Sequence, residues 1–199
     1  LRRTAHRLDP NSQRLLWEAQ ASIQHMRDLI GRLLDFSRVG GARRDVIAPA
    51  VAIENALAPL RPELERIGGR VVYPDLPAVY ASEVLLERLF GNLLGNALKY
   101  RGEEPLVVTI DAIEEASQYR FRVADNGIGF EPHVAPRLFE LFYRAHDPQL
   151  FEGAGMGLYF CRRIVERLGG EIWAESLPDR GAAFFFTLPK PSGVSALAR

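Results

Sequence analysis

Residues 82–101 place the strongest limit on the fold, because their pattern fits a helix that is buried on one side only. Apolar residues recur there at helical spacing and form a stripe: Leu86, Leu89, Leu93 and Ala97. Beside the stripe lie four polar residues at i, i+4, i+7 and i+8: Asn92, Asn96, Lys99 and Tyr100. The apolar stripe must pack on a core. The helix therefore presents two amides, an ammonium and a phenol at the edge of that core.

This polar set has a chemical interpretation and a simpler alternative. Two neutral carbonyl oxygens four residues apart, from Asn92 and Asn96, can ligate a hard cation such as Mg²⁺ without neutralising its charge. Lys99 lies further along the same side and can meet a phosphate that the cation bridges. Taken alone, the same residues could form a solvated polar edge.

The composition is that of a soluble globular protein. A length of 199 residues and an apolar share of 47% suggest one ordinary domain with an appendage. Lys+Arg and Asp+Glu both total 25, so the zero net charge gives no support for nucleic acid or an anionic membrane as the main partner. No apolar run reaches the about 18 residues of a membrane span, and no signal peptide is visible. The single cysteine, Cys161, fits a reducing, cytoplasmic setting.

Residues 10–38 fit a long helix that begins near Pro10 and ends before Gly40-Gly41. Its seam positions are spaced three and four apart, as in a coiled coil, and they are Leu16, Ala19, Ile23, Met26, Ile30, Leu33 and Ser37. No second helix of this kind occurs nearby, so its partner is expected upstream or in another chain. We expect a homodimer through residues 10–38; packing back on the main domain is the alternative.

The remaining sequence mixes strand and helix patterns without regular βαβ alternation. This favours an α/β chain of the α+β two-layer sandwich type over a doubly wound sheet. A helical stretch over 50–67 contains Pro59 and Pro62, which are expected to break or kink it. A further helix is expected over 157–168, where Gly169-Gly170 ends it. Strands are expected at residues 46–48, 71–73, 79–80, 106–113, 119–124, 171–175 and 182–188.

The stretch DNGIG, residues 125–129, follows directly on one of these strands. The Asp125 carboxylate only accepts hydrogen bonds, so it suits an exocyclic amine such as N6 of adenine and rejects O6 of guanine. Gly127 and Gly129 let the backbone approach a flat ring closely. On its own, the stretch could also be a simple turn.

The stretch GAGMG, residues 153–157, opens the last helix. Alternating glycines before a helix N-terminus supply N–H groups and a positive dipole end that suit phosphates. Their spacing is neither that of a dinucleotide-binding fold nor that of a P-loop. Between the two glycine motifs, Phe139 and Phe142 are expected to be anchors packed on the core, and residues 145–152 are expected to form a mobile lid.

In this order, the motifs resemble those of the ATP-binding catalytic domain of sensor histidine kinases. NLLGNALKY is similar to the N box, DNGIG to the G1 box, LFELFYR to the F box and GAGMGL to the G2 box. The match covers residues 44–189, and KYRGEEP and IVERLGGEIWAES are most similar to the phytochrome-type branch. The resemblance implies a Bergerat (GHKL) fold, in which a mixed sheet of roughly five strands is backed by three helices. It also implies that ATP and Mg²⁺ bind between the helix over residues 82–101 and the lid over residues 145–152.

The resemblance implies a role for each matching residue. Asp125 would hold adenine N6, while Asn92 and Asn96 would ligate Mg²⁺. Lys99 and Tyr100 would contact phosphate or ribose. Arg144 would be a candidate for the γ-phosphate, and the catalytic set would be Asn92, Lys99 and Arg144. The residues expected to shape the pocket and lid are Gly127, Ile128, Gly129, Phe139, Phe142, Gly153, Ala154, Gly155, Met156, Gly157 and Leu158.

One position bears on the reaction. In ATPases of the gyrase and mismatch-repair kind, the residue four before the key Asn is a Glu that activates water. Here it is Asn92, and an amide cannot act as a general base. Phosphoryl transfer to a protein acceptor is therefore favoured over hydrolysis.

The helix over 10–38 resembles the second helix of the dimerisation and phosphotransfer hairpin, although the acceptor motif is not found. That motif is a His followed by an acidic residue, with Pro five positions after the His. His6 is followed by Arg7 and has Pro10 four positions on. None of the other histidines fits either: His25, His133 and His146. The acceptor histidine is therefore expected outside this sequence, and the start at Leu1 rather than Met suggests a longer protein with an upstream sensor or membrane segment.

The expected domain organisation is a partial dimerisation helix at 1–39, an ATP-binding catalytic domain at 40–189 with a linker at Gly40–Asp45, and a flexible tail at 190–199. The expected function is the catalytic portion of a two-component histidine kinase, whose partner is a response regulator receiver domain. No nucleic acid is expected as a partner, and no membrane contact within these residues. Two alternatives remain: a serine kinase of the anti-sigma-factor type, and a degenerate nucleotide-binding module that dimerises and acts by protein–protein interaction.

Overall fold

The computed structural model describes residues 43–147, 150–151, 153–176 and 180–191. The predicted coiled-coil helix over 10–38, the first residues of the predicted linker and most of the predicted tail lie outside these residues. Within them, no helix is both long and apolar enough to cross a membrane.

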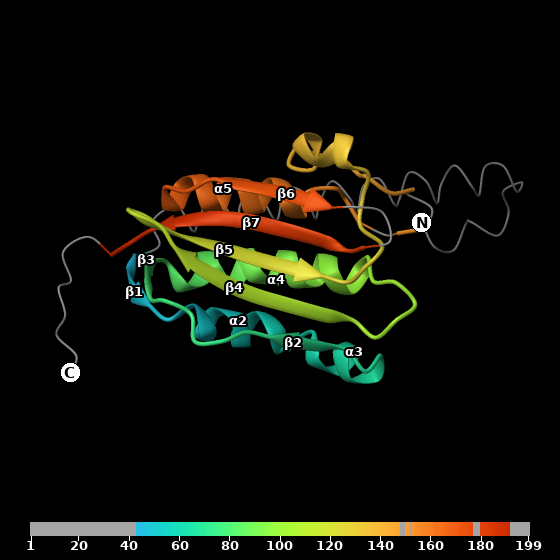
Figure 1. The fold of residues 1–199 in the computed structure, drawn as a ribbon, viewed down its shortest axis with the longest axis horizontal. Helices are drawn as coiled ribbons and strands as arrows, with labels where there is room; N and C mark the ends of the chain where they lie inside the picture. The colour runs from blue at the N-terminus through green and yellow to red at the C-terminus, as the bar shows by residue number, and fades with distance from the viewer. Residues whose placement is uncertain (1–42, 148–149, 152, 177–179, 192–199) are drawn as a thin grey trace, which may run out of the picture. The chain divides into compact units, whose positions relative to one another are not determined.

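One mixed sheet of five strands forms one layer of the described domain (Figure 1). Its order is β2 (Arg70–Val72), β4 (Val107–Glu114), β5 (Gln118–Asp125), β7 (Ala182–Pro189) and β6 (Ile172–Ser176). β2 runs parallel to β4, and every other neighbouring pair is antiparallel. A second, two-stranded antiparallel sheet pairs β1 (Asp45–Ile47) with β3 (Val79–Ala81).

Helices form the second layer and cover one face of the five-stranded sheet (Figure 1). They are α2 (Pro49–Leu57), α3 (Arg61–Arg66), α4 (Glu83–Lys99) and α5 (Gly157–Leu168). A short 3₁₀ helix, η3 (Pro132–Arg137), lies between β5 and α5 in the sequence and was not predicted. The two-layer α+β arrangement with a mixed five-stranded sheet is thus confirmed.

Helix α4 is the central element of the helical layer. Its predicted stripe is buried, since Leu86, Leu89, Leu93 and Ala97 are at most 3% exposed. The helix packs against both α2 and α5. From the sheet side, Phe186 meets the Phe90 ring edge-on at 5.9 Å and stacks on the Phe121 ring at 5.1 Å. Burying a side chain of this size contributes about 1.5–3 kcal/mol, so this core fixes where the polar side of α4 lies.

The predicted break in residues 50–67 is confirmed. Helix α2 ends at Leu57, Pro59 lies in the turn, and α3 begins again at Arg61 with Pro62 in its first turn. Proline is tolerated there because the first helical N–H groups have no partner within the helix. At the other boundary, the predicted linker is partly folded: Asp45 pairs with Ala81 in the small sheet.

Candidate functional site

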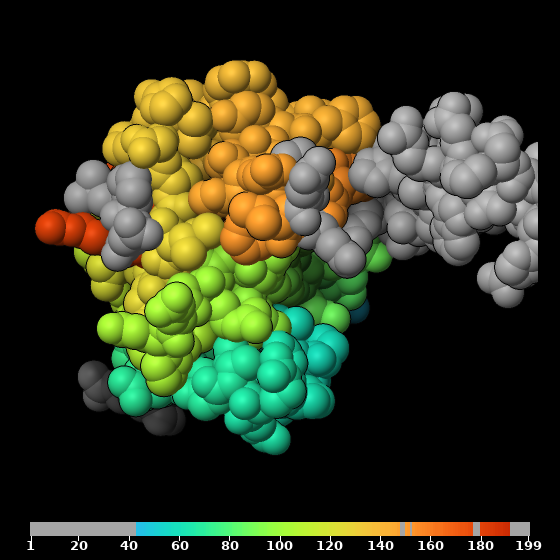
Figure 2. Space-filling view, turned by 90° about the vertical axis from the view of Figure 1, so that its right-hand side faces the viewer, coloured from blue at the N-terminus to red at the C-terminus, as the bar shows by residue number. Residues whose placement is uncertain are grey.

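Three segments that are far apart in the sequence meet at the C-terminal end of α4. They are the end of α4 itself, the DNGIG stretch after β5 and the GAGMG stretch before α5. Figure 2 shows green, yellow and orange parts of the chain next to one another on this side of the molecule. The contacts are close enough to exclude side chains: a Cβ placed on Gly127 would lie 2.4 Å from the Tyr100 carbonyl oxygen. Ile128 also donates its amide to that carbonyl, at 3.0 Å.

Asp125 is the last residue of β5, and its carboxylate faces the turn that follows and the start of β7. Its Oδ1 accepts from the amides of Gly127, at 2.8 Å, and Ala182, at 3.3 Å. Among the described residues, Oδ2 has no hydrogen-bond donor and stays open to a ligand. Burial raises the pKa of the Asp125 carboxyl, and the two backbone hydrogen bonds oppose that rise. The geometry thus holds one carboxylate oxygen in place and offers the other.

Asn92 lies half-buried at the middle of α4 and faces the start of α5. Its Nδ2 donates to the Arg88 carbonyl, one turn back in the same helix, at 2.8 Å. This bond directs Oδ1 the other way, where a Cβ on Gly157 would lie 3.1 Å from it. Asn96 lies one turn further on and is also half-buried. The structure thus brings the predicted amide side of α4 next to the glycine motif.

Lys99 and Tyr100 end the helix and interact with each other. The Lys99 ammonium donates to the Tyr100 hydroxyl at 2.8 Å and lies 4.5 Å from the centre of that ring. A Cβ on Gly153 would lie 3.1 Å from Lys99 Nζ. The second glycine motif therefore approaches both ends of the polar side of α4, Asn92 through Gly157 and Lys99 through Gly153.

Two aromatic residues of the predicted lid, which the sequence reasoning did not single out as site residues, pack on Tyr100. The rings of His146 and Phe151 both lie 5.0 Å from the Tyr100 ring, and 5.5 Å from each other. Burial is the main cause that lowers the pKa of His146; a hydrogen bond with the Gly129 backbone opposes this, and the charge of Lys99 adds to it. No spacing rule links these three positions, because the contact forms only when the loop folds back over α4.

Phe139 and Phe142 differ in the structure. Phe139 is 5% exposed, as predicted for a core anchor, but Phe142 is 49% exposed. The prediction that Phe142 packs on the core is wrong. Its amide donates to the Gly155 carbonyl at 3.0 Å, and its backbone takes a positive φ of 68°. This turn directs the Phe142 side chain to the surface, and its backbone instead holds the second glycine motif.

Arg144 points into the same loop. One of its Nη groups donates to the Phe151 carbonyl, and its Nε is buried without a hydrogen-bond partner among the described residues. A buried guanidinium N–H without a partner is costly, so this position would gain from an acceptor oxygen.

The arrangement can hold a ligand with an amine at one end and oxygen-rich groups at the other. Among the described residues, no cluster of three or more His, Cys, Asp or Glu side chains could hold a metal ion. The oxygen donors available for a cation on α4 are instead the neutral amides of Asn92 and Asn96. Such donors suit a hard cation that is shared with an anionic ligand.

Comparison with known proteins identifies the same region. The sequence profile of the family described as histidine kinase-, DNA gyrase B-, and HSP90-like ATPase matches residues 81–192. Cyanobacterial phytochrome A of Nostoc sp. is 35% identical over 184 residues, which are 92% of this chain and 24% of that protein. The methanogenesis regulatory histidine kinase FilI of Methanothrix harundinacea is 35% identical over 179 residues, 86% of this chain and 20% of that protein. The chain spans about a quarter of the length of the phytochromes it matches.

Solved structures agree on the fold. ShkA, determined in complex with AMPPNP, aligns with a TM-score of 0.69 and 25% identity over 92% of this chain and 39% of that one. The histidine kinase ThkA, in complex with the response regulator protein TrrA, aligns with a TM-score of 0.68 and 18% identity over 95% of this chain and 55% of that one. The second likeness, at this identity, shows the fold alone.

Proposed function

Since the chain belongs to the family of histidine kinase-, DNA gyrase B- and HSP90-like ATPases, we propose that it is the catalytic portion of a two-component histidine kinase. It would bind ATP with Mg²⁺ and transfer the γ-phosphate to a histidine that this sequence does not contain. The observation that carries the proposal is the approach of Gly153 and Gly157 to Lys99 and Asn92. That approach brings a glycine motif at a helix start next to an ammonium, which would meet a polyphosphate, and next to an amide oxygen, which would meet its cation.

Asp125 would bind the adenine. Its open Oδ2 can accept from the N6 amine, while Oδ1 is held by Gly127 and Ala182. A carboxylate that stays ionised cannot donate to the O6 of guanine, so the same oxygen would select against GTP. Gly127 and Gly129 would bring the backbone close to the ring.

The amide oxygens of Asn92 and Asn96 would hold Mg²⁺ beside the phosphates. When bound, the ion would neutralise part of the negative charge on the phosphate oxygens. Asn92 is already oriented for this task by its hydrogen bond to Arg88. Because Asn92 is an amide, it cannot remove a proton from water, and this favours transfer to a protein over hydrolysis.

Lys99, Tyr100 and Arg144 would meet the phosphates and ribose. Lys99 is directed by the Tyr100 hydroxyl, and Arg144 offers an Nε that lacks an acceptor within the part of the chain that the structure describes. The remaining contacts would come from the loop residues Ile128, Phe139, Phe142, Ala154, Gly155, Met156 and Leu158, with residues 145–152 as the lid. The unpaired Cys161, which is fully buried, is compatible with a cytoplasmic site of action.

The partner of this chain would be the receiver domain of a response regulator. The proposed division is a dimerisation helix at 1–39, a catalytic domain at 40–189 and a tail at 190–199; the described residues belong to one compact unit that begins at Ala42, which supports the first boundary. The non-enzymatic alternative, a degenerate module, is less favoured because the Asn, Lys, Asp and glycine set is complete.

The phosphotransfer test uses the chain as it is and a separate dimerisation hairpin that carries an acceptor His. With ATP labelled on the γ-phosphate, we expect weak, acid-labile labelling of the hairpin and none of the chain itself. Release of free phosphate without labelling would show a hydrolase and contradict the proposed transfer. Label on His6 or His25 would show that the acceptor lies within this sequence.

We also propose that the chain is a homodimer through residues 10–38. Five large apolar side chains of the predicted seam would otherwise stay in water, at about 1.5–3 kcal/mol each. Replacing Ile23 and Ile30 by Lys should give a monomer that still binds ATP. Light scattering that shows the unmutated chain as a monomer at high concentration would contradict this assembly.

A further inference from the structure

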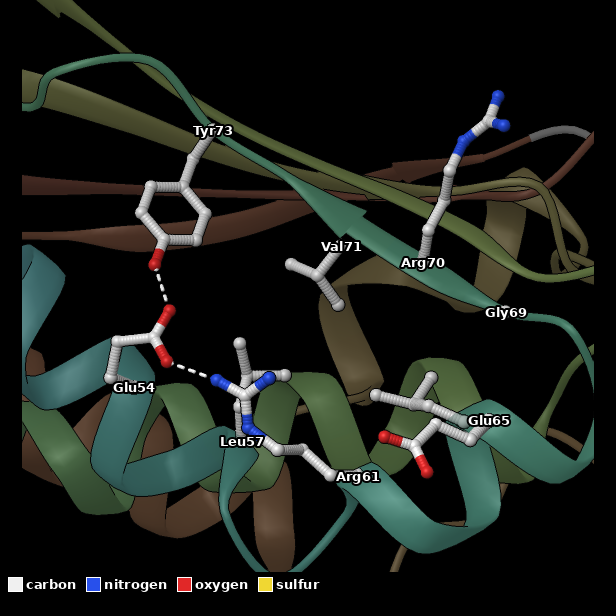
Figure 3. A pocket seen from close by; sticks show the side chains of 9 residues that line it. Glu54, Leu57, Arg61, Glu65, Gly69, Arg70, Val71 and Tyr73 are labelled. Atoms are coloured by element: carbon white, nitrogen blue, oxygen red, sulfur yellow. Dashed lines mark hydrogen bonds and ion pairs between the residues drawn. The ribbon is translucent and has the colours of Figure 1, made fainter.

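A pocket on a different part of the domain opens between the helices and the edge strand β2 (Figure 3). It encloses about 200 Å³ and is lined by residues of α2 and α3, by β2 and by the residues on either side of β2, Gly69 and Tyr73. None of its lining residues belongs to the proposed nucleotide site. Figure 3 shows Val71 and Tyr73 pointing from the strand side toward the helices, whereas Arg70 points away.

The floor of the pocket is apolar, and the charge of the Glu54 carboxylate on its wall is already balanced by Arg61. Leu57 and Leu64 lie at its base and are 6% and 8% exposed. On the wall, the Glu54 carboxylate accepts from both the Arg61 guanidinium and the Tyr73 hydroxyl. Burial, followed by the bond to Glu54, raises the pKa of Tyr73 to about 12, so its hydroxyl remains a donor. The floor of the pocket therefore suits an uncharged, apolar side chain.

The strand beside the pocket has a free edge. Among the described strands, β2 pairs only with β4. Arg70 donates its amide to the Leu106 carbonyl at 2.8 Å, so its backbone faces β4. Because backbone direction alternates along a strand, the N–H and C=O of Val71 face the open side. The residue that offers free backbone groups is thus also the one whose side chain lines the pocket.

Charge at the mouth is asymmetric. Arg70 is exposed on the other face of the sheet and has no ion pair among the described residues. Glu65 lines the pocket on the helical side, also without an ion pair there. A strand added beside β2 would place an acidic side chain next to Arg70, whereas an acidic side chain inside the pocket would meet Glu65 and Glu54.

We propose that this pocket and the β2 edge bind an extended segment of a partner protein by strand addition. The segment lies antiparallel to β2. From its N-terminal side, three consecutive residues pair with β2: an apolar residue, then Leu or Phe, then Asp or Glu. The middle side chain enters the pocket above Leu57 and Leu64, and its backbone pairs with Val71. The acidic residue lies opposite Arg70, and the first apolar residue lies opposite Val72, which is 49% exposed. Main-chain bonds supply affinity in this mode, and the pocket supplies specificity.

The test follows the backbone amides of the ¹⁵N-labelled chain by NMR while a capped peptide, Thr-Thr-Val-Leu-Glu-Thr-Lys, is added. We expect shifts centred on Gly69–Tyr73. Two matched peptides, one with Asn for Leu and one with an N-methylated Leu, should bind roughly tenfold more weakly, because they lose the apolar anchor or its main-chain bond. Arg70→Glu should weaken binding roughly threefold, and a peptide with Lys for Glu should recover it.

The control for the nucleotide site is Asp125→Asn, which should leave peptide binding unchanged whether or not ATP binds. The proposal is overturned if neither the Leu peptide nor the same peptide with Phe in place of Leu produces a shift at Gly69–Tyr73 at about 1 mM. Equal binding of the N-methylated peptide would also overturn it, as would shifts confined to residues 92–100 and 125–129.

Discussion

The two ends of the candidate site are built differently. At the Asp125 end, the carboxylate lies at the end of a central strand and is held by backbone amides of its own turn and of β7. At the Lys99 end, the contacts come from side chains of a loop, with His146 and Phe151 packed on Tyr100. The first end is thus part of the sheet, whereas the second depends on how a loop folds over a helix. We infer that the first end fixes which base binds and that the second adapts to the phosphates.

The largest effect is expected at the sheet end. Asp125→Asn removes a charge-assisted acceptor and should weaken ATP binding by about 2–3 kcal/mol, roughly 30- to 150-fold. Isothermal titration calorimetry measures the affinity of each variant for ATP. The matched control is Asp111→Asn, which breaks an exposed ion pair with Arg122 and should leave ATP affinity unchanged. Equal losses in the two variants would mean that the Asp125 end does not recognise the base.

A smaller effect is expected where the loop is held. Gly155 has a φ of 67°, and a Cβ there would lie 2.8 Å from the Tyr143 carbonyl oxygen. Gly155→Ala should lower the free energy of unfolding by about 1–3 kcal/mol and also weaken ATP binding. Gly68→Ala is the control, because Gly68 has a φ of 65° but no atom within 4 Å of its Cβ position. Gly68→Ala should lower the free energy of unfolding by less, because only the backbone conformation is strained, and it should leave ATP affinity unchanged. Denaturant titration measures the difference in unfolding free energy between the two variants.

The smallest effect concerns His146 and pH. Because burial lowers its pKa from 6.5, the folded chain favours the neutral ring. The contribution to stability is therefore present above pH of about 6.5 and is lost as the pH falls through the lower folded value. Unfolding measured from pH 7 downward should show a steeper loss for the native chain than for His146→Gln. His133→Gln, at an exposed site outside the cluster, should keep the native profile.

Sequence and structure agree where local patterns determine the result. The apolar stripe of α4, the Pro59–Pro62 break and the Gly169 helix end all follow from spacing or backbone chemistry, and each is confirmed. The position of Asp125 at the end of a strand is confirmed as well, since β5 ends there, while its role in the site stays a prediction. The exposure of Phe142 was not, because it depends on the Gly155 contact, which joins two motifs across a loop. The contacts of His146 and Phe151 with Tyr100 were not predicted either, although both residues lie in the predicted lid, because these contacts also depend on how the loop folds.

The edge at β2 adds a second lesson. The sequence predicts a short strand at residues 71–73, but it could not show that Val71 would have a free backbone and line a pocket. That property arises only from the order of the strands, which leaves β2 at the edge.

The central claim, that Asp125 and the glycine motifs form an adenine-nucleotide site, is tested most directly by titrating the chain with ATP and with GTP under the same Mg²⁺ concentration in a calorimeter. We predict measurable binding of ATP and binding of GTP that is weaker by about 2 kcal/mol or more, because the Asp125 oxygen meets an acceptor instead of a donor. Equal affinity for the two nucleotides would contradict the assignment of Asp125 and, with it, the difference drawn between the two ends of the site.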